Sequence, residues 1–241
     1  MKTALLGTVA LLAASIAPLA AAQPVLYELF TSEGCSYCPA AEAIAKDHHE
    51  QALAGTGTAV VLEWHVQYFD RHGWKDRFGL PIARDRQVLY GKLFRGLIGT
   101  PQAVLGGTTP ADGRDRKQID AQVAAQSNQQ GVTTLRGATA AWIANACRIE
   151  FTLPAAAPNS ALMVCVTEDK LTTEVKGGEN KGKTLTHNGV VRAAATAAMA
   201  VGANRIDLPI PAEVVRAHAR AVVVIQDRGT LAVQAIASIK P

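Results

Sequence analysis

Two cysteines separated by two residues are the part of this sequence best suited to chemistry. They form the run Cys35-Ser36-Tyr37-Cys38, and Pro39 follows directly. At the start of a helix this spacing lets two sulfurs meet, and the unpaired N–H groups there favour the reactive thiolate. We therefore expect an exposed Cys35 to attack a disulfide and Cys38, the inner thiol, to resolve the mixed disulfide.

The segments on either side of the cysteines predict the framework that holds them. Residues 25–30 have the apolar content of a buried strand, and the alanine-rich run after Pro39 predicts a helix. Residues 58–66 are rich in β-branched and aromatic side chains and predict a second strand. A C-x-x-C pair beside such a β-α-β unit is the sequence mark of a thioredoxin-like site.

Two further residues are candidates for the catalytic site. If Glu28 points beneath Cys38, its carboxylate would accept and return the thiol proton; the alternative is a glutamate at the surface. Pro101 follows Thr100, and a cis proline facing the cysteines would shape a groove for a partner peptide. A trans turn is nevertheless the default for an X-Pro bond.

The segment from residue 64 to residue 78 concentrates aromatic, histidine and aspartate side chains. We expect it to wall the groove beside the thiols, so that His65 and Trp74 contact the substrate together with Tyr37 and Thr100. The alternative is a packed loop whose aromatic side chains belong to the core and whose aspartates cap turns.

The other two cysteines are candidates for a structural disulfide. Cys147 and Cys165 lie on strand-like segments on either side of a turn near residue 156. If the two segments pair as a hairpin, the cysteines stand opposite each other within bonding reach. The alternative is two buried thiols.

The first residues predict export. Lys2, the apolar run of residues 4–19 and Ala20-Ala21-Ala22 follow the order of a signal peptide, with a cut expected after Ala22. The protein is then periplasmic or secreted, with no later membrane span. The chain has 24 basic and 20 acidic residues, so we expect no nucleic-acid partner.

The predicted elements divide the chain after the signal peptide of residues 1–22 into two domains. Residues 23–134 read as an α/β thioredoxin-like domain, a β-α-β unit with an inserted helix near residues 81–94. Residues 135–241 carry short strand-like pieces at close spacing, which predicts an antiparallel β-sandwich-like domain.

Four ordered blocks of the sequence resemble a known family. The blocks are residues 28–39, residues 65–70 with 73–78, Thr100-Pro101-Gln102, and residues 178–185 with 190–192. They resemble a secreted bacterial family catalogued as domain of unknown function 1223, and the resemblance covers nearly all of the chain after the signal peptide. It implies a thioredoxin-like fold and places Pro101 where such folds carry a cis proline. Gln67 departs from the family pattern, which usually has aspartate there, so the resemblance implies no carboxylate role at that position.

The sequence favours a thiol–disulfide oxidoreductase acting on exported proteins or small thiols. One alternative is a copper- or zinc-binding module with Cys35, Cys38 and His65 as ligands. Another is a non-catalytic secreted binding protein whose Cys35–Cys38 disulfide braces the helix start. We expect no cofactor, since the glycines near residue 178 lack the spacing and strand context of a nucleotide-binding loop.

Overall fold

Residues 22–241, apart from 97, 130 and 156–158, are described by a computed structural model of the protein. Except for Ala22, the predicted signal peptide lies outside the described residues, so its cleavage site stays a prediction. In the described part, no helix combines the length and the apolar character needed to cross a bilayer.

The first half of the chain alternates strands and helices around the cysteine pair. The predicted strands and helices are present here, with one further short strand beside Pro110 that the sequence did not indicate. The elements are β1 (Val25–Thr31), α1 (Cys38–Leu53), β2 (Ala59–His65), the 3-10 helix η1 (Gln67–His72), α2 (Pro81–Leu93), β3 (Gln102–Leu105), β4 (Thr109–Asp112) and α3 (Arg116–Ser127).

The second half consists mainly of strands. They are β5 (Thr133–Thr134), β6 (Thr139–Ile143), β7 (Ala146–Leu153), β8 (Ser160–Glu168), β9 (Leu171–Glu174), β10 (Thr184–His187), β11 (Val190–Ala197), β12 (Gly202–Pro209), β13 (Ala219–Asp227) and β14 (Val233–Ile239), with the 3-10 helix η2 (Arg216–His218) before β13.

Gly189 divides a segment that reads as one strand in the sequence. Its φ angle is 67°, a conformation that glycine adopts without steric cost, and it separates β10 from β11. A Cβ at this position would also lie 3.1 Å from the carbonyl oxygen of Val61. The turn lets β10 leave the large sheet and pair with β9 instead.

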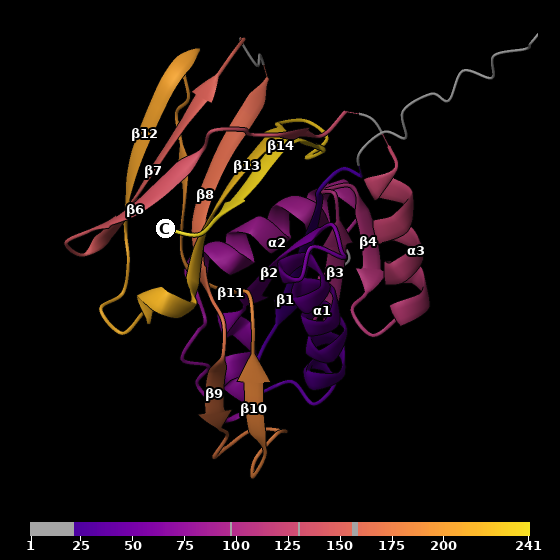
Figure 1. The fold of residues 1–241 in the computed structure, drawn as a ribbon. Coiled ribbons are helices and arrows are strands. Elements are labelled where there is room, and N and C mark those ends of the chain that lie inside the picture. The colour runs from indigo at the N-terminus through magenta and orange to yellow at the C-terminus, as the bar shows by residue number, and fades with distance from the viewer. Residues whose placement is uncertain (1–21, 97, 130, 156–158) are drawn as a thin grey trace, which may run out of the picture.

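Both halves of the chain contribute to one nine-stranded sheet, with the order β4-β3-β1-β2-β11-β8-β13-β14-β5 (Figure 1). Strands β1 and β2 run parallel, β3 is antiparallel to β1, and β11 meets β2 in parallel at the pair Val190 and Glu63. The molecule is therefore a mixed α/β protein with a large sheet and few helices. The boundary expected at residue 135 falls directly after β5.

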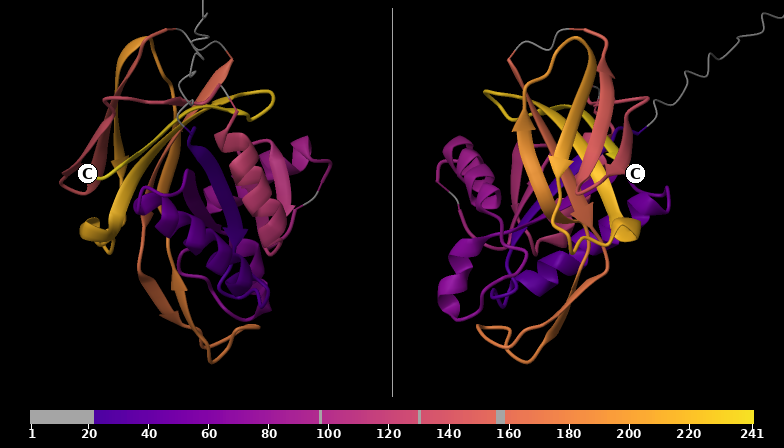
Figure 2. Two further views of the ribbon diagram at one scale, coloured as in Figure 1. Left: turned by 45° about the vertical axis from the view of Figure 1, so that its right-hand side comes forward. Right: turned by 90° about the vertical axis from the view of Figure 1, so that its left-hand side faces the viewer.

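Among the described residues, three hydrophobic clusters lie between the layers of helices and sheets, whose arrangement Figure 2 shows. Helices α1 and α3 pack on one face of β1 and β2, around Tyr27, Leu29 and Ile119. Helix α2 packs on the opposite face, against Phe30 and Trp64. A separate sheet in the order β12-β7-β6 covers β8 and β13 and encloses the third cluster.

The disulfide expected between Cys147 and Cys165 is absent, and both residues are buried thiols. Strand β7 pairs with β6 and β12 instead of with β8, so the two cysteines lie in different sheets. Their side chains also belong to different hydrophobic clusters. Burial raises the pKa of Cys147 to about 11, and it raises the pKa of Cys165 still further, so both thiols stay protonated at neutral pH.

A buried ion pair joins the two halves on the α2 face of the sheet. Glu28 is fully buried, and its carboxylate accepts hydrogen bonds from Trp64 Nε1 at 2.7 Å, Arg86 Nη2 at 2.8 Å and the Tyr90 hydroxyl. Arg86 Nη2 also donates to Gln226 Oε1 on β13 at 2.8 Å. The network satisfies a charge pair in the core and bridges β1, α2 and β13.

Replacing Glu28 by alanine should destabilise the protein strongly, because it leaves the Arg86 guanidinium buried without its carboxylate. Breaking one side of such a pair costs about 3–5 kcal/mol, which urea denaturation followed by circular dichroism would measure. Asp207→Ala is the matched control, since it breaks an exposed ion pair with Arg148 and should leave the unfolding midpoint unchanged. Equal midpoints for the wild type and Glu28→Ala would contradict the assignment.

Candidate active site

The thiols of Cys35 and Cys38 meet in the turn that leads into α1. Cys38 is the first residue of the helix and Pro39 the second, where a missing N–H leaves no hydrogen bond unmade. The Cys35 amide donates to the carbonyl oxygen of Ser32 at 3.1 Å, and the Cys38 amide donates to that of Cys35 at 3.2 Å. This tight turn brings the Cys38 thiol within hydrogen-bond reach of the Cys35 sulfur.

The surroundings of the two sulfurs separate their acidities. The hydrogen bond from Cys38 is the largest influence on Cys35 and lowers its pKa to about 6, against burial, which raises it. The backbone N–H groups of Tyr37 and Cys38 at the helix start also lower the pKa of Cys35. Burial raises the pKa of Cys38 far above that of an ordinary thiol. Cys35 is therefore the thiolate and Cys38 the thiol at neutral pH.

The loop before β3 faces the cysteines. The Thr100–Pro101 peptide bond is cis, and Cys35 Sγ lies 3.8 Å from the carbonyl oxygen of Thr100. A cavity of about 420 Å³ opens beside this loop, lined by Ile98, Thr100, Pro101, Pro110 and Ala111. The structure thus brings Thr100 and Pro101 next to the thiols and adds a partly apolar hollow.

A loop from the second half of the chain packs against the turn that carries Cys35. We call residues 175–183, between β9 and β10, the strap. The buried Asn180 donates from Nδ2 to the carbonyl oxygens of Glu33 at 2.9 Å and Cys35 at 2.8 Å. Glu179 accepts a hydrogen bond from the Ser36 amide at 2.9 Å. A Cβ on Gly178 would lie 3.6 Å from Gly34 Cα, so the strap lies directly on the turn.

The expectation of an exposed Cys35 is wrong for this conformation. Cys35 is 1% exposed and Cys38 is fully buried. The strap lies against the Cys35 backbone and the Thr100 loop lies beside its sulfur. Since the sequence placed the strap more than a hundred residues away, nothing local indicated this cover.

Glu28 does not lie beneath Cys38. Side chains alternate along β1, so Glu28 shares the α2 face with Leu26 and Phe30, whereas α1 and its cysteines pack on the other face. Its carboxylate is held by Arg86 instead. The polar group next to Cys38 is the Thr31 hydroxyl, which donates in turn to Glu42.

The remaining predicted contact residues divide into exposed and buried ones. Tyr37 is 62% exposed, and the Arg114 guanidinium lies 4.8 Å from the centre of its ring. Trp74 is half-buried and donates from Nε1 to Glu33 Oε2 at 2.8 Å. His65 is 1% exposed and bound to Asp76, so the prediction that it contacts a substrate is wrong for this conformation.

Behind the thiols lies a buried polar cluster that sequence reasoning missed. Glu42, His65 and His187 each bring one potential ligand atom to within 4.8 Å of the others. Among the described residues, Cys35 and Cys38 are not part of such a group, so the structure does not assemble the predicted Cys-Cys-His metal site. Glu42 follows Cys38 by four residues, the spacing that places two side chains on one helix face, and this was the available signal.

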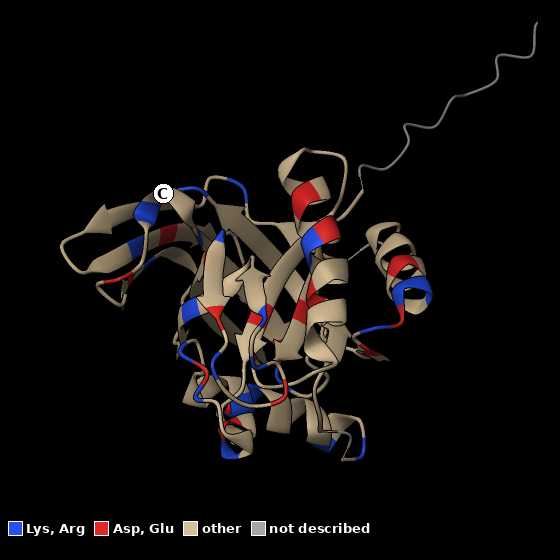
Figure 3. Ribbon diagram, turned by 90° about the horizontal axis from the view of Figure 1, so that it is seen from below, with Lys and Arg blue, Asp and Glu red and all other residues tan. Residues whose placement is uncertain are grey.

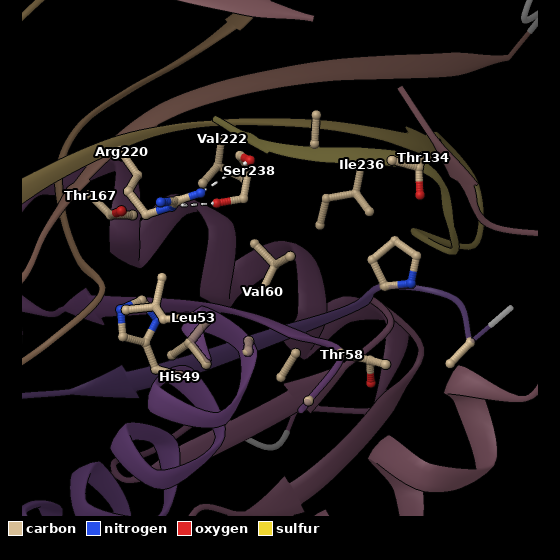
Figure 4. A pocket seen from close by; sticks show the side chains of 17 residues that line it. His49, Leu53, Thr58, Val60, Thr134, Thr167, Arg220, Val222, Ile236 and Ser238 are labelled. Carbon is tan, nitrogen blue, oxygen red and sulfur yellow. Dashed lines mark hydrogen bonds between the residues drawn. The ribbon is translucent and has the colours of Figure 1, made fainter. Parts of the chain in front are cut away.

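A second cavity lies at the opposite end of α1. It measures about 370 Å³ and is lined by His49 and Leu53 below and by Arg220, Val222 and Ser238 above (Figure 4). Arg220 Nε donates to Ser238 Oγ at 2.9 Å, which anchors that side chain to the wall. The 16 residues of α1 span about 24 Å, so this cavity lies well away from the thiols.

The end of the molecule that carries the strap shows charges of both signs. In Figure 3, which looks at the molecule from below, Lys and Arg are interspersed with Asp and Glu.

Fold and site together define a mixed α/β protein with a dithiol at a helix start, facing a cis proline and covered by a strap. Residues 26–226 match a family profile described as protein of unknown function, DUF1223. The match covers most of the chain, so the protein belongs to the DUF1223 family.

Two solved structures share the fold. A structural-genomics protein from Agrobacterium tumefaciens is 24% identical, with a TM-score of 0.64, and the alignment covers 90% of this chain and 94% of that one. HBP35 of Porphyromonas gingivalis is 12% identical, with a TM-score of 0.58, covering 91% of this chain and 75% of that one. No curated protein matches the chain.

The reaction of Cys35 with a small neutral alkylating agent should rise with pH and level off above neutrality. The thiolate is the reacting form, and its pKa of about 6 sets a midpoint about 2 to 3 pH units below that of an ordinary cysteine. Rapid-mixing rates on the reduced protein between pH 4 and pH 10 would measure this profile.

The Cys38→Ala variant tests why the alkylation of Cys35 has a low pH midpoint. This variant removes the hydrogen bond that contributes most to the lowered pKa of Cys35, so its alkylation midpoint should move to higher pH. Cys147→Ala is the control, because this thiol lies in another cluster. A midpoint near 8.5 in the wild type would refute the assignment of Cys35 as the thiolate.

Proposed function

We propose that this protein is a thioredoxin-like thiol–disulfide oxidoreductase that acts outside the cytoplasm on exported proteins or small thiols. The observation that carries the proposal is the pairing of an acidified Cys35 with a protonated Cys38 at the start of α1, opposite the cis Thr100–Pro101 bond. The order of the surrounding elements, β1-α1-β2 and then β3-β4-α3, supports the thioredoxin-like assignment.

The acidities of the two thiols assign the order of the exchange steps. The Cys35 thiolate attacks one sulfur of a partner disulfide, forms a mixed disulfide and releases the other partner sulfur as a thiolate. Cys38 then gives up its proton, which the released partner thiolate can take, and attacks Cys35 Sγ; the bond between Cys35 and the partner breaks, and the second partner sulfur leaves as a thiolate. The products are the Cys35–Cys38 disulfide and a reduced partner, and the reverse sequence oxidises a dithiol partner.

The strap must move before a protein partner can reach Cys35, since this residue is 1% exposed. Its attachment is polar, through Asn180 and Glu179, and such contacts exchange for water at low cost. The cavity beside Pro101 then supplies an apolar surface next to the sulfur. We therefore assign the described conformation to the closed state of the enzyme.

Cys38→Ser should trap the mixed disulfide. With oxidised glutathione as the probe, this variant should accumulate one glutathione per chain on Cys35, because the resolving thiol is gone. Intact-mass analysis before and after reduction measures the adduct, and Cys35→Ser is the matched control, which should form none. A glutathione adduct on Cys38 of the Cys35→Ser variant, with none on Cys35 of the Cys38→Ser variant, would show that the two cysteines have the opposite roles.

Asn180→Ala should make Cys35 more reactive. It removes two hydrogen bonds between the strap and the turn, which shifts the equilibrium toward the open state and raises the alkylation rate several-fold at a fixed pH. Lys181→Ala is the control, because this exposed residue lies in the same strap without a side-chain bond to the turn. Identical rates for all three proteins would show that the strap does not gate the thiol.

A further inference from the structure

Six ionisable side chains are buried together on the α1 face of the sheet, behind the thiols. His65 and Glu63 come from β2, Glu42 from α1 and His187 from the end of β10. Glu33 and Asp76, from the flanking loops, complete the cluster. None is more than 4% exposed.

Each histidine has one ring nitrogen held by a carboxylate, and in the described part of the chain the second nitrogen makes no close hydrogen bond. His65 Nδ1 lies 2.7 Å from Asp76 Oδ2, and His187 Nδ1 lies 2.9 Å from Glu42 Oε2. Within the described residues, His65 Nε2 and His187 Nε2 make no hydrogen bond. At His65 the Asp76 carboxylate on Nδ1 fixes the tautomer and leaves Nε2 as an acceptor, the arrangement that orients metal-binding imidazoles. At His187 an ion would take the place of the proton between Nδ1 and Glu42.

The charges of the cluster favour a cation. Glu33, Glu63 and Asp76 are buried in the same cluster as Glu42 and the two histidines, so four carboxyl groups gather there. Glu33 Oε1 also lacks a hydrogen bond and stands 3.5 Å from His187 Nε2. Carboxylates buried together are costly without a positive partner, which the histidines or a bound cation supply.

A route from solvent reaches this cluster. A cavity of about 250 Å³ opens between α1 and β10, lined by Pro39, Glu42, Lys46, Thr184 and Thr186. Glu42 therefore lies between the cavity and the two histidines. An ion can enter beside Glu42 without passing the thiols.

We propose that Glu42, His65 and His187 bind one divalent transition-metal ion, and that this ion links α1, β2 and β10. Zinc fits best, because two imidazoles with one carboxylate is a common zinc ligand set. The three ligand atoms lie within 4.8 Å of one another, and atoms around one zinc ion stand about 3.4 Å apart, so binding draws them inward by about an ångström.

The consequence of this site is a fixed base for the hairpin that carries the strap, while the strap itself remains free to move. His187 is the last residue of β10, the strand that follows the strap. Glu42 lies on α1, the helix that begins at Cys38, and His65 ends the neighbouring strand β2. A bound ion therefore ties the base of the strap hairpin to the thiol-bearing helix. This inference goes beyond the redox proposal and does not depend on it, since no cysteine is a ligand.

Metal uptake by the purified protein tests the inference. After chelator treatment and dialysis, the protein should take up one zinc per chain by elemental analysis and one cobalt per chain by absorption. The Cys35→Ser/Cys38→Ser double variant should bind both ions equally well, with no thiolate-to-cobalt charge-transfer band. His187→Gln and Glu42→Gln should bind at least about tenfold more weakly, whereas His72→Gln, at an exposed histidine, should bind normally.

Far-ultraviolet circular dichroism checks that each variant is folded. If the ligand variants do not fold, the melting temperature of the double-serine variant decides the matter, since a specific zinc site raises it and its absence leaves it unchanged. No uptake by the folded wild type, uptake that requires the cysteines, or normal binding by folded His187→Gln and Glu42→Gln would each overturn the proposal. Trapping of glutathione at Cys35 is unaffected by these outcomes, so failure of the metal site leaves the redox proposal separately testable.

Discussion

The arrangement of the whole molecule depends on the alternation of side chains along β1 and β2. Both strands are buried on both faces, and both carry ionisable groups, so each charge must find its partner on one particular side of the sheet. On the α2 side, Glu28 meets Arg86. On the α1 side, Glu63 and His65 join a cluster that includes His187 from the second half of the chain. Neither cluster is complete without residues from distant segments.

The same constraint explains why the thiols are so unlike each other. Cys38 faces the interior beside Thr31, where burial favours its neutral form, whereas Cys35 accepts hydrogen bonds from Cys38 and from the first N–H groups of the helix. The difference between the pKa values of Cys35 and Cys38 thus has two causes. Cys38 is more deeply buried, and the N–H groups at the start of the helix point toward Cys35. The strap adds a third factor, because it binds the backbone of the turn that carries Cys35, a residue that is only 1% exposed.

Local patterns were enough to predict the elements around the site but not their long-range partners. Strands β1 and β2 followed from their apolar and β-branched runs, and the starts of α1 and α2 followed from Pro39 and Pro81. The sequence could not predict on which face of β1 the Glu28 side chain lies. Residues 25–31 are buried on both faces of the sheet, so they show no alternation of polar and apolar residues that would distinguish the two faces.

The errors at Cys147 and Cys165 and at the strap share one cause. Strands adjacent in the sequence were expected to pair, yet β7 and β8 belong to different sheets. His187 approaches Glu42 from 145 residues away, and no periodicity within one segment encodes such a meeting. Pairing across the sheet depends on the total of many contacts, which is information that no short window of sequence contains.

The parallel contact between β2 and β11 has a consequence for how this family can diversify. The pair Val190 and Glu63 and the hydrogen bond from the Glu63 amide to the Gly189 carbonyl join the two halves there, on the side of β2 that would otherwise be an open strand edge. A polypeptide of residues 23–134 alone would expose that edge of β2. It would also leave Arg86 without its hydrogen-bond partner Gln226. We therefore expect a fragment of residues 23–134 to be less stable than the full chain, which limits how the dithiol half could be recombined with other partners.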